Sequence, residues 1–155
     1  MTAVRDLLGE HALFEGFAPA HLDLLASLAT ERSVPAGGLL FREGELAKWC
    51  YILRAGRLAL EAHSPTAGAL VVGTLGPGQL VGWSWLFPPH RWQFDARAVT
   101  DVEIVALDAV GLTEVADGDP TFGYPLLRRM LEMSVARLQQ ARLQVLDVYG
   151  GRSSR

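Results

Sequence analysis

Few side chains in this sequence have the type and spacing that catalysis or metal binding requires. The four histidines are scattered, without the short intervals typical of a metal site. They are His11, His21, His63 and His90. The single cysteine, Cys50, lies in the apolar run 49–53, where a buried, inert thiol is expected. Asp117 and Asp119 flank Gly118 in a turn, where carboxylates are normally solvated. Because no nucleophile–base pair or phosphate-cradling loop is present, we predict that the protein is not an enzyme and holds no metal.

The segment 82–94 concentrates the unusual side chains. It holds three of the four tryptophans and two phenylalanines. Tryptophan faces can stack on a flat or apolar ligand, while polar side chains beside them can anchor it. The same aromatic groups could instead fill the interior and leave no site. The candidate pocket residues are Gly82, Trp83, Ser84, Trp85, Arg91, Trp92 and Gln93.

The elements that must position this segment are predicted to be short strands between helices. Residues 1–30 are expected to be helical, with the better helix beginning near Pro19. Residues 31–108 alternate apolar runs with glycine-bearing turns, which indicates a sandwich or barrel. The strands are expected near 38–42, 48–54, 57–63, 68–75, 92–99 and 101–108. Residues 109–149 are expected to form a short helix and then a long one that stops at Gly150–Gly151. These elements form one domain over 1–150, followed by a tail, 151–155.

Alternation along residues 91–98 predicts which side chains face the interior. The apolar set is expected to point inward. The apolar set consists of Trp92, Phe94, Ala96 and Ala98. The opposite face consists of Arg91, Gln93, Asp95 and Arg97. A slip of one residue that turned Arg91 inward would expose the whole apolar set. Only a bulge confined to the loop 88–90 would bring Arg91 to a ligand.

The long C-terminal helix carries a heptad pattern. Leu131, Leu138 and Val145 are seven residues apart, and the second seam includes the small residues Ser134 and Ala141. Small side chains let a second helix approach closely. The stripe could instead pack on the chain's own barrel, but we favour a homodimer through these five residues.

Composition limits the classes of partner. The chain has 155 residues, a net charge of −3 and an apolar fraction of 50%, which fits one folded domain. No dense basic run is present, so nucleic acid is not expected as a direct partner. Neither a signal peptide nor a membrane-spanning run is found, which predicts a cytoplasmic protein without a membrane partner.

Several motifs resemble those of the cyclic nucleotide-binding domain family. The run FREGE at 41–45 and YILRAGRL at 51–58 resemble the opening of such a domain. LGPGQLVG at 75–82 resembles the approach to its phosphate-binding cassette, and RAVTDVE at 97–103 resembles the strand pair that follows. The resemblance implies a mainly β fold with flanking helices. The expected core is an eight-stranded jelly-roll (double-stranded β-helix) barrel, with N-terminal helices, a long C-terminal helix and a ligand pocket inside the barrel.

The cassette departs from the family pattern at its charged positions. In the family a glutamate accepts from the ribose hydroxyl and an arginine pairs with the cyclic phosphate. In an ungapped alignment Gly82 matches the family's glycine, but Trp83 falls on the glutamate and Trp92 on the arginine. Gln93 falls on the hydroxyl residue that follows. Cyclic AMP or cyclic GMP, the ligands that the resemblance suggests, are therefore expected to bind weakly or not at all.

Two functions follow from this pattern. Catabolite-activator-type regulators add a DNA-reading domain after the long helix, whereas this sequence stops at Arg155, so we expect the sensing half alone. The leading hypothesis is a ligand-sensing regulatory module that acts through an effector protein. A small-molecule ligand in the barrel would shift the cassette and, through it, the packing of the long helix. The alternative is an interaction or scaffold protein with a degenerate, self-plugged ligand site.

Overall fold

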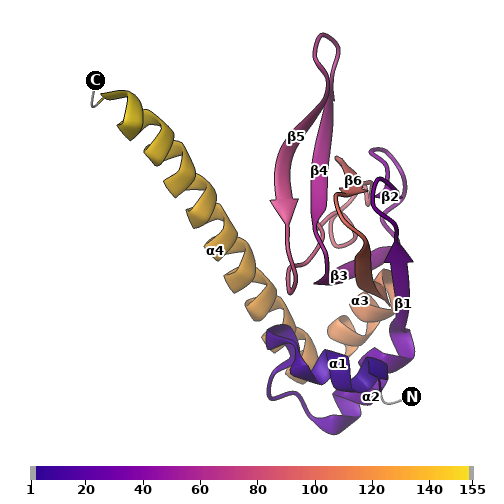
Figure 1. The fold of residues 1–155 in the computed structure, drawn as a ribbon. Helices are drawn as coiled ribbons and strands as arrows, with labels where there is room; N and C mark the ends of the chain where they lie inside the picture. Colours follow the sequence, from indigo (N-terminus) through magenta and orange to yellow (C-terminus); the bar gives the residue numbers. More distant parts are fainter. Residues whose placement is uncertain (1–2, 154–155) are drawn as a thin grey trace. The chain divides into compact units, whose positions relative to one another are not determined.

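The structure is a computed structural model that describes residues 3–153 (Figure 1). It divides into two compact units, one up to Val115 and the other from Ala116 onward, which are described separately here. The helices of the first unit and the short helix that leads into the second are α1 (Ala3–Glu10), the 3-10 turn η1 (Ala12–Phe14), α2 (Pro19–Leu28) and α3 (Ala109–Gly118). The strands are β1 (Ala29–Val34), β2 (Leu39–Phe41), β3 (Trp49–Ala55), β4 (Leu58–Ser64), β5 (Gly68–Leu75), β6 (Asp95–Ala98) and β7 (Val102–Asp108). The long helix α4 (Pro120–Ser153) makes up most of the second unit.

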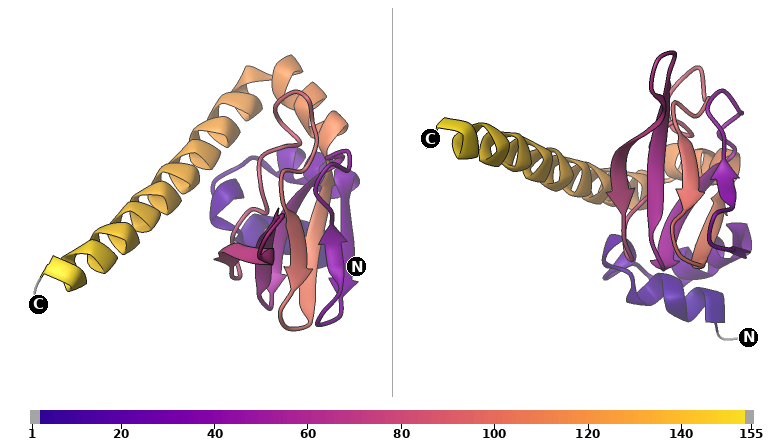
Figure 2. Two further views of the ribbon diagram at one scale, coloured as in Figure 1. Left: turned by 90° about the horizontal axis from the view of Figure 1, so that it is seen from above. Right: turned by 45° about the horizontal axis from the view of Figure 1, so that its top comes forward.

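The strands form two antiparallel sheets, which confirms the jelly-roll type of fold. One sheet has the order β1-β7-β3 and the other β2-β6-β4-β5 (Figure 2). The centre of both sheets is apolar, and Leu53, Leu58 and Ile104 are almost completely buried. Residues 79–81 run beside β3 through the isolated bridge Ile52–Leu80. The count of eight strands stays a prediction, because seven regular strands are assigned within residues 3–153.

The strand β1 was not expected from the sequence. The sequence predicts a helical region through residue 30, which includes Ala29 and Thr30, and no strand over 31–34. In the structure β1 pairs with β7 from Ala29–Leu107 to Val34–Val102. The segment ATERSV has little apolar alternation, because β1 is an edge strand held mainly by backbone hydrogen bonds.

Glycine sets the sharp turn between β3 and β4. Gly56 has φ +88°, and a Cβ there would lie 2.2 Å from the Asp101 carbonyl oxygen. Only glycine fits this combination of left-handed backbone and close approach. Gly44, in the connection between β2 and β3, likewise has φ +89°. Both glycines therefore occupy turn positions with a positive φ.

The helix α4 is longer than expected. It begins at Pro120 and contains Pro125 in its early part. It continues through Gly150–Gly151 to Ser153, so the expected stop at these glycines is wrong. Glycine lowers helix propensity by about 1 kcal/mol but ends a helix only where it takes a left-handed conformation. The last two tail residues lie outside the described part of the chain.

The predicted dimer stripe on α4 is exposed in the single chain. Leu131 is 64% exposed, Leu138 53% and Val145 54%. Of the small residues on the second seam, Ser134 is half-buried and Ala141 is exposed. No helix within residues 3–153 has the length and apolar content needed to cross a membrane.

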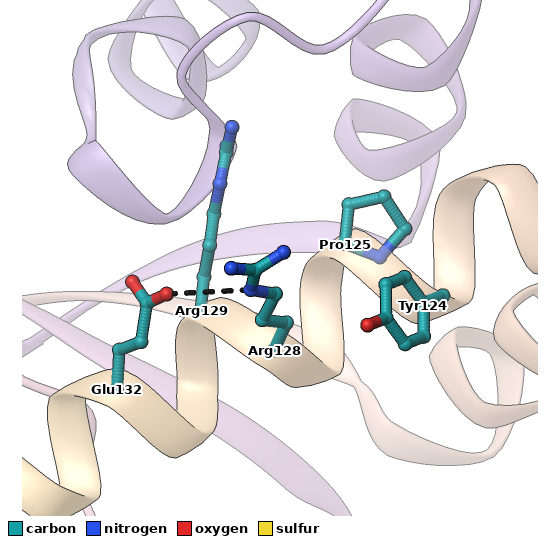
Figure 3. Close-up of a pocket in the computed structure, with 5 residues that line it drawn as sticks. All are labelled: Tyr124, Pro125, Arg128, Arg129 and Glu132. Carbon is teal, nitrogen blue, oxygen red and sulfur yellow. Dashed lines mark ion pairs between the residues drawn. The ribbon is translucent and has the colours of Figure 1, made fainter.

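A shallow hollow of about 270 Å³ also lies along α4 (Figure 3). Its lining residues all come from this helix: Tyr124, Pro125, Arg128, Arg129 and Glu132. Arg128 and Glu132 form an ion pair of 3.6 Å one helical turn apart, and both side chains are 67% exposed. Such an exposed pair contributes little to stability, and this hollow contains none of the predicted site residues.

Candidate ligand site

The cassette begins where residues 79–81 leave β3. The Val81 N–H donates to the Tyr51 carbonyl at 2.9 Å, and the next residue, Gly82, has φ +81°. A turn follows, closed by the Leu86 N–H and the Trp83 carbonyl at 3.0 Å. In this part of the described chain the cassette forms turns and bends, without a regular helix.

Trp92 fills the interior beside Gly82. Its side chain is 4% exposed, and a Cβ on Gly82 would lie 2.9 Å from the Trp92 ring. The ring stacks on Phe41, with centroids 3.9 Å apart and planes within 7° of parallel. Trp92 therefore faces inward, as strand alternation predicts, and its indole occupies the space in front of the cassette glycine.

Arg91 points away from this interior. It is exposed, and its Nη1 donates to the Gly44 carbonyl at 2.8 Å. The backbone on either side pairs regularly with the β2–β3 connection. The Trp92 N–H donates to the backbone carbonyl of Glu45 at 2.9 Å, and the Ala47 N–H donates to the backbone carbonyl of His90 at 2.7 Å. No inward bulge turns Arg91 toward the interior. Instead, its side chain holds the β2–β3 connection through the hydrogen bond to the Gly44 carbonyl.

The remaining candidate residues separate into two groups. Trp85 is 4% exposed, and its Nε1 has no hydrogen-bond partner among the described residues. Trp83 and Ser84 are half-buried. Gln93, by contrast, is exposed. The structure thus brings Gly82 and Trp92 into contact and leaves Arg91 and Gln93 outside.

The expected alternation fails at two positions. Phe94 is 38% exposed, although it was placed inward, and Asp95 is only 6% exposed, although it was placed outward. Regular pairing of β6 starts only at Asp95, so residues 93–94 do not follow the strand period. Specific partners stabilise the buried carboxylate: the Glu43 N–H donates to Oδ1 at 2.8 Å, and His63 Nε2 contacts Oδ2 at 2.7 Å.

This Asp95–His63 pair was missed by the sequence reasoning. The N–H of Glu43 and then His63 hold the pKa of Asp95 below its ordinary value. The hydrogen bond and charge of Asp95 in turn raise the pKa of His63. The aspartate therefore ties the end of β4 to the start of the β2–β3 connection. The only sequence signal was an acidic residue at the head of an apolar strand, which does not identify its partners.

The other groups that could do chemistry are unreactive or dispersed. Cys50 is completely buried, and this burial raises the pKa of its thiol, as expected for an inert cysteine. Residues 3–153 contain no cluster of three or more His, Cys, Asp or Glu side chains placed to hold a metal ion.

Fold and cassette together define a cyclic nucleotide-binding type of domain, and comparisons with known proteins agree. The family described as "Cyclic nucleotide-binding domain" matches residues 31–119, more than half of the chain, so the chain belongs to this family. The cyclic AMP receptor protein of Thermus thermophilus is 33% identical over 95 residues, covering 61% of this chain and 44% of that protein. A CRP-like cAMP-activated global transcriptional regulator of Mycobacterium tuberculosis is 24% identical over 123 residues. The chain spans about half the length of these curated relatives, 44% and 55% respectively.

Solved structures show the same fold. The Thermus thermophilus catabolite activator protein has a TM-score of 0.66 at 28% identity, covering 86% of this chain and 61% of that one. A cyclic nucleotide-binding domain from Methylobacillus flagellatus has a TM-score of 0.76 at 18% identity, covering 92% of this chain and 80% of that one. The chain is therefore a cyclic nucleotide-binding-type regulatory domain.

Proposed function

We propose that this chain is a non-enzymatic, ligand-sensing regulatory module whose cassette does not hold a cyclic nucleotide in the family's manner. The observation that carries the proposal is the position of Trp92. Its buried ring lies against Gly82 and Phe41, where the family resemblance places an arginine for the cyclic phosphate. An indole supplies no positive charge with which to pair a phosphate.

The rest of the cassette supports the same proposal. Trp83 stands at the position of the ribose-binding glutamate, so a second charged contact is missing. Arg91 does not replace the lost arginine, because its guanidinium is engaged by the Gly44 carbonyl. The buried Nε1 of Trp85 is an unpaired donor, which a ligand carrying an acceptor would satisfy. A reshaped cassette for a flat or apolar ligand fits these features.

The proposal includes the assembly and the place of action. The exposed stripe Leu131–Leu138–Val145 on α4 is the dimer interface, with Ser134 and Ala141 allowing close approach. Regulation then passes to an effector protein through this helix. We place the protein in the cytoplasm, since the curated relatives are named as a cyclic AMP receptor protein and a transcriptional regulator.

Calorimetry with cyclic AMP and cyclic GMP tests the proposal. Each lost charge-assisted contact contributes about 1.5–3 kcal/mol, so two of them weaken binding roughly a hundred-fold or more. The Thermus thermophilus cyclic AMP receptor protein, measured under the same conditions, is the positive control. We expect this chain to bind either nucleotide at least about a hundred-fold more weakly than the control. A submicromolar dissociation constant would overturn the proposal.

A further inference from the structure

A second hollow, separate from the cassette, lies beside β1, β2 and β3. Its volume is about 420 Å³, within the range of small-molecule sites. The residues that line it are Arg32, Leu40, Phe41, Glu45, Leu46, Lys48, Trp49, Tyr51 and Trp92. Among the candidate cassette residues only Trp92 belongs to this set. We refer to this hollow as the Arg32 cleft.

The aromatic residues of the Arg32 cleft lie nearly parallel. Phe41 and Trp92 are stacked 3.9 Å apart, and Tyr51 is inclined by 20° to Phe41 and by 27° to Trp92. Leu40, which is half-buried, and Leu46, which is 50% exposed, add apolar surface. Phe41, Tyr51 and Trp92 are each only 4% exposed, so Leu40, Leu46 and the half-buried Trp49 give the cleft most of its accessible apolar surface.

Arg32 supplies a preoriented cation at this cleft. Its guanidinium carbon lies 4.5 Å from the ring centroid of Trp49 and 5.8 Å from that of Tyr51. Its Nη1 donates to the Tyr51 hydroxyl at 3.3 Å. No carboxylate among the described residues forms an ion pair with Arg32. The planar group therefore keeps most of its five N–H donors for another acceptor.

The charge of the Arg32 cleft favours an anion. Lys48 is exposed, and the described residues give it no ion pair, whereas Glu45 contributes one negative charge. Arg32, Lys48 and Glu45 together leave a formal charge of +1. A held guanidinium matches the two oxygens of a carboxylate.

From these features we infer that the Arg32 cleft binds a flat aromatic carboxylate, with its ring on the apolar surface of Leu46 and Trp49 and its carboxylate on Arg32. Such a ligand would touch Trp92, the same residue that closes the cassette. The inference does not depend on what the cassette binds, because Trp92 is the one candidate cassette residue that lines the cleft and the ligand chemistry is different.

NMR titration with 2-naphthoate tests this inference. We expect the indole N–H resonance of Trp49 to shift and saturate, with smaller changes at Trp83. The neutral isostere 2-naphthamide should bind at least about ten-fold more weakly than 2-naphthoate, because it lacks the charge that Arg32 recognises. Equal binding of both probes, or no shift at Trp49 at millimolar probe, would overturn the inference.

Substitutions then locate the charge. Arg32→Met keeps the aliphatic stem and should weaken 2-naphthoate binding about ten-fold or more. Lys48→Met should weaken it less, since this exposed amine acts at the rim. Arg57→Met, at an exposed arginine that does not line the cleft, is the matched control and should leave binding unchanged. Unchanged binding by both Arg32→Met and Lys48→Met would contradict the assignment.

Discussion

Trp92→Ala is the substitution that most directly measures how well the interior in front of the cassette is filled. The indole is 96% buried, stacks on Phe41 and lies against the backbone of Gly82. A glycine backbone and a stacked ring cannot collapse into the space that the indole leaves. Truncation should therefore cost about 3–5 kcal/mol of unfolding free energy, the range for large buried aromatic side chains.

Urea unfolding at a fixed protein concentration measures this cost. With an m value of about 2 kcal/mol/M, the midpoint should fall by roughly 1.5–2.5 M while m stays constant. Phe87→Ala is the matched control, since Phe87 belongs to the same aromatic segment but is 61% exposed. Its effect should stay within about 0.5 kcal/mol. A loss below about 1 kcal/mol for Trp92→Ala would refute the argument that this ring fills the interior.

Two further predictions concern the long helix and the buried carboxylate. Leu138→Glu should convert a dimer to a monomer in sedimentation velocity. Leu143→Glu, at an exposed leucine off the seam, should leave the dimer intact. A wild-type protein that is monomeric at roughly tens of micromolar contradicts this interface. The pKa of His63 is raised by Asp95. The contribution of protonated His63 to folding stability is therefore fully present below pH 6.5 and is lost as the pH rises through the raised pKa. In an NMR titration His63 should have a midpoint above 6.5, and Asp95→Asn should lower it; equal midpoints would show that the pair is not formed.

Local chemistry explains why much of the barrel could be predicted from the sequence. Gly44 and Gly56 stand where the chain needs a positive φ, and glycine is the residue that adopts it without strain. The apolar run of β3 and the alternation that buries Trp92 also reflect local pattern. Each of these features is decided within a few residues along the chain.

The errors arose where partners distant in sequence decide the structure. β1 forms because β7, 68 to 78 residues later along the paired positions, offers it a backbone ladder. Asp95 is buried because Glu43 and His63 meet it, at separations of 52 and 32 residues. The Arg32 cleft likewise joins residues from three strands and two connections. Periodicity cannot report such pairings, because it describes one segment at a time.

A crystal structure of the protein purified without added nucleotide tests the central claim most directly. The account predicts that the Trp92 indole lies buried against Gly82 and stacked on Phe41, with Arg91 turned outward to the Gly44 carbonyl. A cyclic nucleotide in the barrel, with Trp92 turned to solvent and Arg91 on the phosphate, would contradict it.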